Sequence, residues 1–158
     1  ATFEANAEKK ARVYSKRTKS LCVADDSGLM INALKGEPGV YSARYAGKGC
    51  SYEDNNRKVL GALAHTPWPK RTAKFVSVVS IYDNGVKIKT VRGECVGRIG
   101  FMLKGENGFG YDPVFIPKGS PKTYAELSSK DKNRISHRGR ALRKAKIALA
   151  RYFLNNST

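Results

Sequence analysis

The stretch KFVSVVSIYDNGVKIKTVR, residues 74–92, is the part of the chain that decides the fold class. Lys74 to Tyr82 is rich in β-branched and aromatic residues, which favour strands. Asp83-Asn84-Gly85 is a strong turn signal, because asparagine and glycine tolerate the left-handed backbone of tight hairpin turns. Val86 to Arg92 supplies the returning strand. The stretch therefore predicts a long β-hairpin.

Helices are predicted before and after this hairpin. Thr2 to Arg17 places apolar residues at helical spacing behind a threonine that can cap the first turn. Ser51 can cap a second helix, since Asp54 follows at the capping-box position. The last helix is expected from about Ser136 to Leu154, with one apolar face and one strongly basic face.

Two short strands and a loop complete the expected layout. Leu21 to Ala24 is predicted to be a strand that runs into the turn Asp25-Asp26-Ser27-Gly28, and Leu29 to Leu34 a second strand. Gly105 to Pro113 is a glycine-rich loop with two aromatic residues. Helices mixed with short strands and a long hairpin predict a single α/β domain at the border of the α+β class.

The composition bounds the function before any motif is considered. The chain has 158 residues, 41% hydrophobic and 27% charged, so it can bury one sizeable core and general disorder is excluded. No run approaches the roughly 18 apolar residues that a membrane helix needs. The three cysteines lie far apart in sequence, which favours reduced thiols in a cytoplasmic compartment. Lys and Arg number 30 against 13 Asp and Glu, a formal net charge of +17, which favours a polyanionic partner.

Asp25 and Asp26 form the first candidate site. Two adjacent carboxylates at a strand end are hard oxygen ligands that could hold Mg²⁺ or orient a water. Asp-Asp-Ser-Gly is also ordinary turn chemistry, so a solvated turn explains the same residues. Lys10 on the first helix is a further candidate, although a lysine on a helix is mostly a solvated charge.

Gly108 to Pro113 is the second candidate. Phe109 and Tyr111, separated by Gly110, can offer a ring face to a nucleobase, and Asp112 can accept from ring N–H donors. The alternative is a loop whose aromatic side chains pack into the core.

The third candidate is the segment from Lys132 to Gly139. Its cations precede and occupy the start of the last helix, where the helix dipole favours negative charge. An anion or a carbonyl oxygen bound near His137 and Arg138 would relieve that conflict. A surface charge run is the alternative.

Taken together and in this order, these segments resemble one family, the Ham1/RdgB-type inosine triphosphate pyrophosphatases, which remove non-canonical purine nucleotides. The stretches that carry the resemblance span nearly the whole chain: residues 2–12, 24–29, 39–47, 108–115, 123–127 and 132–139.

The resemblance implies Mg²⁺-dependent hydrolysis of ITP, dITP or XTP to the monophosphate and pyrophosphate. It implies that Asp26 acts at the metal and the attacking water, and that Lys10 contacts phosphate. The other implied site residues bind the substrate: Ser27, Phe109, Gly110, Tyr111, Asp112, Lys132, His137 and Arg138. Of these, His137 and Arg138 can donate to the 6-carbonyl of hypoxanthine or xanthine but would oppose the 6-amine of adenine, so ITP and XTP are expected ahead of ATP.

The implied fold is an elongated, two-lobed α/β structure with a long central mixed sheet, and family members are commonly homodimers. Family chains open with a strand and a phosphate-cradling loop of the Ser/Thr-x-Asn-x-x-Lys type. The present sequence contains no such motif, so we expect its sheet to lack that first strand. A partner chain or a rearranged sheet is then expected to cover the open edge.

A second function, of a different class, is kept open. The excess of positive charge is larger than one triphosphate needs, so the same fold could serve as a basic module that binds RNA or DNA or takes part in assembly. The residues expected on that basic surface are Lys70, Arg71, Lys87, Lys89 and the last helix.

Overall fold

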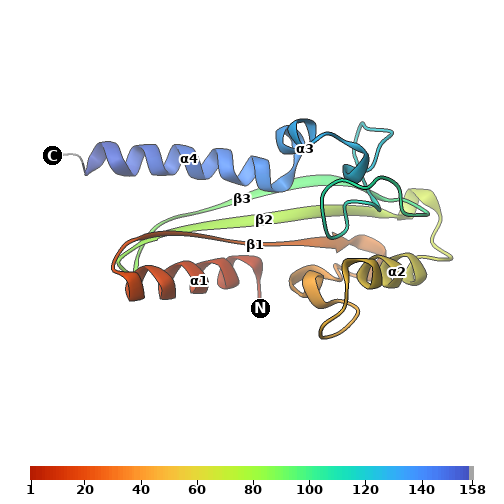
Figure 1. Cartoon of the computed structure of the whole chain (residues 1–158), viewed down its shortest axis with the longest axis horizontal. Helices are drawn as coiled ribbons and strands as arrows, with labels where there is room; N and C mark the ends of the chain where they lie inside the picture. The colour runs from red at the N-terminus through yellow and green to blue at the C-terminus, as the bar shows by residue number, and fades with distance from the viewer. Residues whose placement is uncertain (157–158) are drawn as a thin grey trace. The chain divides into compact units, whose positions relative to one another are not determined.

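The computed structural model describes residues 1–156 and consists of one four-stranded sheet with flanking helices (Figure 1). The strands are β1 (Leu21–Ile31), β2 (Thr72–Asp83), β3 (Val86–Ile99) and β4 (Phe115–Pro117), in that order across the sheet. The helices are α1 (Phe3–Thr18), α2 (Tyr52–Ala62), α3 (Ser129–Ile135) and α4 (His137–Asn155). Short 3₁₀ turns occupy Asn32–Leu34, Gly39–Arg44, Trp68–Lys70 and Tyr124–Glu126.

The predicted hairpin is confirmed, and its strands extend beyond the predicted residues 74–92 at both ends. β2 and β3 join through Asn84 and Gly85, both with positive φ. Across the described residues the sheet is antiparallel, whereas a mixed sheet was implied. Each of these strands follows its neighbour in sequence and returns beside it, so no pair of them is parallel.

The turn predicted at residues 25–28 is wrong. β1 runs without a break from Leu21 to Ile31, and the two short strands expected there are one. The neighbouring hairpin offers a ladder for the backbone N–H and C=O groups, and that pairing outweighs the local turn preference of Asp-Asp-Ser-Gly.

The helix caps are confirmed. The Thr2 side chain accepts from the Ala5 N–H, and Ser51 and Asp54 form a reciprocal capping box. The last helix begins at His137 as expected, but α3 was not predicted. Lys132 lies in the last turn of α3, where the helix dipole favours a cation, so the expected conflict does not exist there.

The chain divides into two compact units, each assembled from segments far apart in sequence. Unit 1 comprises residues 1–27, 76–94 and the described part of the chain from His137 onward. Unit 2 comprises residues 28–75 and 95–136. Each of the three long strands contributes residues to both units.

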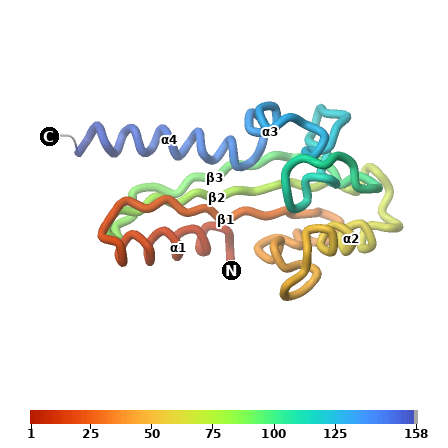
Figure 2. The backbone as a smooth tube through the Cα atoms, in the orientation of Figure 1, coloured from red at the N-terminus to blue at the C-terminus, as the bar shows by residue number. Residues whose placement is uncertain are grey.

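In unit 1, α1 and α4 cover opposite faces of the strands (Figure 1). Ala7 and Ala11 of α1 are fully buried, and the hairpin turn lies beside the end of α1 (Figure 2), where the Gly85 N–H donates to Ser15 Oγ at 3.0 Å. On the other face, a Cβ at Gly93 would lie 2.3 Å from the His137 carbonyl oxygen. A glycine at this position lets the start of α4 touch β3.

Unit 2 has its own core, built around three aromatic rings. The Phe75 and Phe115 ring centroids are 4.7 Å apart in an edge-to-face arrangement, and Phe75 stacks on Tyr124 at 5.7 Å. All three rings are buried, as are Leu29 and Val59 beside them.

Arg71 is a fully buried cation of unit 2, with 1% of its surface exposed. Its guanidinium donates to four backbone carbonyls, those of Leu63, Thr66, Ile99 and Gly100. Burial lowers the pKa of Arg71 from its usual value. The expectation that Arg71 lies on a basic surface was therefore wrong. Its side chain instead joins the segment after α2 to the end of β3 through hydrogen bonds.

The three cysteines carry free thiols. Within residues 1–156, the helices are too short or too polar to traverse a bilayer.

We predict that Arg71→Leu lowers the free energy of unfolding by about 3 kcal/mol or more, because it leaves several buried carbonyls without donors. Arg57→Leu is the matched control. It removes an exposed i,i+4 ion pair with Glu53 and should change stability by less than about 0.5 kcal/mol. Urea denaturation of both variants measures the difference, and equal stability of the two would contradict a structural role for Arg71.

Candidate functional site

Asp26 is held against α1 by two side chains from successive turns of that helix. Asn6 Nδ2 donates to Asp26 Oδ2 at 3.0 Å, and Lys10 Nζ lies 3.1 Å from Asp26 Oδ1. Residues four apart share one helix face, which is why Asn6 and Lys10 reach the same carboxylate. Lys10 also donates to the backbone carbonyl of Asp25. Lys10 therefore belongs to a cluster with both aspartates, and 44% of its side chain remains exposed.

Asp25 belongs to a different cluster on the other face of the sheet. Successive side chains of a strand point to opposite faces, so Asp25 and Ser27 face α4 while Asp26 faces α1. The Arg138 guanidinium lies 3.1 Å from Asp25 Oδ2, and Ser27 Oγ donates to the same oxygen at 3.1 Å. The two adjacent carboxylates do not converge on one point, in contrast to the expectation of a paired oxygen site.

His137 and Arg138 form the first turn of α4. A cation there opposes the helix dipole, and the Asp25 carboxylate compensates for it. An external anion is thus not needed to explain Arg138. His137 is buried, with 6% of its surface exposed, and its backbone carbonyl packs against Gly93.

The glycine-rich loop of unit 2 is organised around the buried carboxylate of Asp112. Asp112 Oδ2 accepts from the Phe109 N–H at 2.9 Å and pairs with the Lys132 ammonium group from α3. A Cβ at Gly108 would lie 1.9 Å from the same oxygen, and Gly108 has a φ of +77°. Both the space and the backbone conformation therefore require glycine at this position.

Lys132 also lies over two aromatic rings. Its Nζ is 4.9 Å from the Phe109 ring centroid and 5.5 Å from that of Tyr124. Phe109 is 52% exposed, and its ring lies 6.3 Å from that of Tyr52 on α2. An exposed ring beside a paired cation and carboxylate is suited to hold a flat heterocycle with polar edges.

Tyr111 behaves differently from Phe109. Its ring belongs to the core, its hydroxyl donates to the Ser42 carbonyl at 2.7 Å, and burial raises the pKa of the phenol. The alternative of core packing is therefore correct for the Tyr111 ring and incorrect for Phe109.

Two asparagines belong to these clusters, although the sequence alone did not predict them as site residues. Asn6 contacts Asp26, and Asn56 Nδ2 donates to the Gly110 carbonyl at 2.8 Å. The signal for Asn6 was its position one helical turn before Lys10. The signal for Asn56 was a polar residue of low helix propensity within a helix, where a specific hydrogen bond is a common reason for its presence.

Comparison with known proteins shows to which family the chain belongs. The sequence model of the Ham1 family matches residues 1–148. The chain belongs to the Ham1 family. It is 48% identical over 154 residues to the dITP/XTP pyrophosphatase of Desulforamulus reducens. The aligned residues make up 98% of this chain and 77% of that protein. It is 49% identical over 146 residues to the dITP/XTP pyrophosphatase of Caldanaerobacter subterraneus, covering 92% of this chain and 72% of that protein.

Solved structures of Ham1 proteins share the fold. The Staphylococcus aureus Ham1 protein superposes with a TM-score of 0.86 at 43% identity, over 100% of this chain and 79% of the other. A Ham1 protein from Coxiella burnetii gives 0.87 at 41% identity, over 95% of this chain and 77% of the other. The resemblance recognised in the sequence is therefore confirmed for the family and for the fold.

The surroundings of Asp26 can be compared with those of known magnesium sites. Within residues 1–156, no three or more His, Cys, Asp or Glu side chains gather as a metal cage. Mg²⁺ is usually held by one or two protein carboxylates, and waters and substrate phosphates complete its shell. A single, partly exposed carboxylate beside a lysine fits this kind of site, in which the substrate brings much of the coordination.

Proposed function

We propose that this chain hydrolyses ITP, dITP and XTP to the monophosphate and pyrophosphate. The observation that carries the proposal is the cluster of Asn6, Lys10 and Asp26, in which a partly exposed carboxylate is held between an amide and a cation. Support for the substrate class comes from Ham1 relatives that are named dITP/XTP pyrophosphatases.

In this proposal, Asp26 acts on the phosphate side of the reaction. Its carboxylate holds Mg²⁺ and orients the attacking water, and Lys10 binds phosphate oxygens with its ammonium group. Bound Mg²⁺ would supply neutralisation of the triphosphate charge. Asn6 fixes the carboxylate by its 3.0 Å hydrogen bond, so that the geometry exists before the substrate arrives.

The nucleoside side of the reaction is assigned to a second set of residues. Phe109 offers its exposed ring to the base, and Lys132 and Asp112 offer one donor and one acceptor beside it. Gly110 lets the loop backbone approach the nucleoside, and the buried Tyr111 ring anchors that loop. The remaining substrate contacts are proposed for Ser27, His137 and Arg138.

We predict that Asp26→Asn abolishes pyrophosphate release and leaves the fold intact. The amide keeps the shape and can still bond Asn6, but it lacks the charge that metal and water need. Glu53→Gln, an exposed carboxylate on α2, is the matched control and should retain full activity. Release of pyrophosphate from ITP and circular dichroism measure the two properties, and near-normal turnover by Asp26→Asn would remove Asp26 from this role.

We predict that kcat/KM is at least about a hundredfold higher for ITP and XTP than for ATP. With ATP, the hydrogen-bond donors of the site would face the 6-amine of adenine and would lack the 6-carbonyl acceptor. Arg138→Ala should shrink that ratio more than it lowers ITP turnover. Asp25→Asn is the matched control, because it breaks the ion pair and keeps the guanidinium. If Asp25→Asn reduces the ratio as much as Arg138→Ala, the ratio depends on the Asp25–Arg138 ion pair and not on a contact of Arg138 with the base.

A second candidate function is binding of RNA or DNA. A groove of about 600 Å³ in unit 1 runs between β3 and α4. Its lining includes Arg140, Arg143 and Lys144, together with Glu94 and with Arg92, which pairs with Glu4 and Glu94. We predict binding without sequence preference that weakens steeply with salt through counterion release. Fluorescence anisotropy with a labelled oligonucleotide at two salt concentrations measures it. Arg143→Ala should weaken binding, whereas Lys9→Ala on α1 should not, and no binding at either salt concentration would contradict this function.

Two further properties are proposed on narrower grounds. A homodimer rests on the family resemblance, and a cytoplasmic location rests on the three free cysteines.

A further inference from the structure

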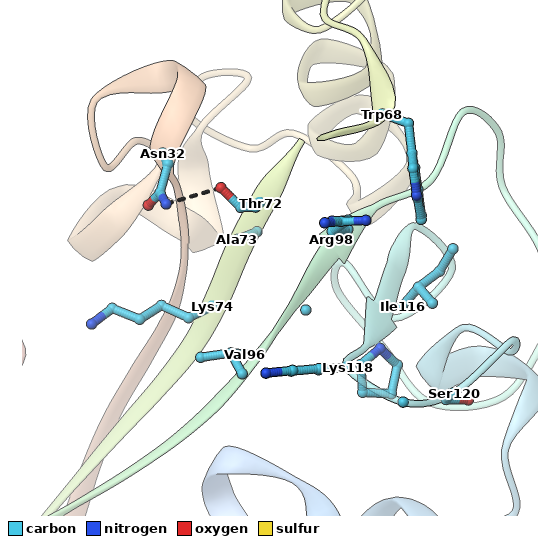
Figure 3. Close-up of a pocket in the computed structure, with 13 residues that line it drawn as sticks. Asn32, Trp68, Thr72, Ala73, Lys74, Val96, Arg98, Ile116, Lys118 and Ser120 are labelled. Carbon is cyan, nitrogen blue, oxygen red and sulfur yellow. Dashed lines mark hydrogen bonds between the residues drawn. The ribbon is translucent and has the colours of Figure 1, made fainter. Parts of the chain in front are cut away.

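A cavity of about 480 Å³ lies in unit 2 and is lined by residues of β2, β3 and β4 and of the segments beside them (Figure 3). Side chains alternate along a strand, and Ala73 and Phe75 of β2 point into the core. Their neighbours Thr72 and Lys74 therefore point to the opposite face and line the cavity. Gly97 permits the close approach of β4 there, because a Cβ would lie 2.3 Å from the Ile116 carbonyl oxygen.

The residues that line this cavity include cations and no acidic residue. Arg98 of β3 and Lys118 after β4 line it, with Lys74 extending at its rim, and the lining contains no aspartate or glutamate (Figure 3). Among residues 1–156, neither Arg98 nor Lys118 forms an ion pair. In the other clusters of this chain, cations such as Lys132 and Arg138 are matched by carboxylates. Unmatched cations around a concave surface favour an anion.

One wall of the cavity is apolar and aromatic. The Trp68 ring lies 5.2 Å from the Arg98 guanidinium carbon, and Ile116 and Pro117 complete that wall. The volume is within the range of small-molecule sites and exceeds what a single phosphate fills. The lining thus matches a ligand with a phosphate at one end and a flat, partly apolar ring at the other.

We propose that this cavity is a second binding site for a mononucleotide. The phosphate lies at Arg98 and Lys118, and the base lies against Trp68 and Ile116. Arg98, stacked on the tryptophan, is fixed in place and offers its N–H groups to phosphate oxygens. None of these residues belongs to the clusters around Asp26 or Asp112, so this site stands independently of the proposed hydrolysis.

Trp68 is the only tryptophan of the chain and reports directly on the cavity. The experiment titrates AMP into the full chain with EDTA present, at constant ionic strength, and follows Trp68 fluorescence alongside calorimetry. AMP is the probe because its 6-amine is unsuited to the base site proposed for ITP. Pyrophosphate and adenosine are titrated separately, to distinguish the phosphate contribution from that of the base.

Lys118→Ala is the test variant and Lys122→Ala the matched control, since Lys122 lies four residues on and outside the cavity lining. We expect saturable AMP binding that is tighter than binding of pyrophosphate or adenosine. Lys118→Ala should weaken it about tenfold, as for the loss of one charge-assisted hydrogen bond, and should leave ITP hydrolysis unchanged. Lys122→Ala should leave AMP binding unchanged.

Four results would overturn the proposal. The first is the absence of both a fluorescence change and heat with AMP. The second is equal weakening by Lys118→Ala and Lys122→Ala, which would show general surface charge. The third is a signal lost in Lys10→Ala and retained in Lys118→Ala, which would place the ligand at the Asp26 cluster. The fourth is pyrophosphate binding as tightly as AMP, which would show a site for free phosphates without base recognition.

Discussion

The alternation of side chains along β1 is the constraint on which the arrangement of the acidic residues depends. Asp25 and Asp26 are neighbours in sequence, yet the pleat sends one to α4 and the other to α1. A shift of one residue in the register of β1 would exchange them and bring Asp25 to Lys10. The pleat therefore gives each carboxylate one cation of its own: Asp25 pairs with Arg138 at the start of α4, and Asp26 pairs with Lys10 on α1.

The sequence predicted those features that are local. The hairpin follows from its Asn-Gly turn, and the caps at Thr2 and Ser51 follow from short-range hydrogen bonds. The continuity of β1 did not follow, because it depends on pairing with β2, which is remote in sequence. For the same reason, sequence alone could not separate Phe109 from Tyr111, since the difference is whether a core from other segments receives the ring.

The candidate site residues were predicted as a set, whereas their partners were not. Residue types and order indicate the Ham1 family, which the family model confirms, and the candidate site residues remain what that resemblance predicts. The pairings of Arg138 with Asp25 and of Asn56 with Gly110 join segments more than fifty residues apart. Such contacts carry no periodic signal. They are fixed only when the strands and helices that present the two side chains have packed.

The positive charge of the chain is not one continuous property of its surface. Arg71 is buried and acts as a structural donor, and Lys132 and Arg138 are each matched by an aspartate. Arg98 and Lys118, by contrast, border a cavity without an acidic partner. A cation without a carboxylate partner leaves its charge uncompensated, so an anionic ligand at Arg98 and Lys118 would supply the missing counter-charge. The net charge of +17 is therefore informative about partners only after each cation is assigned to its surroundings.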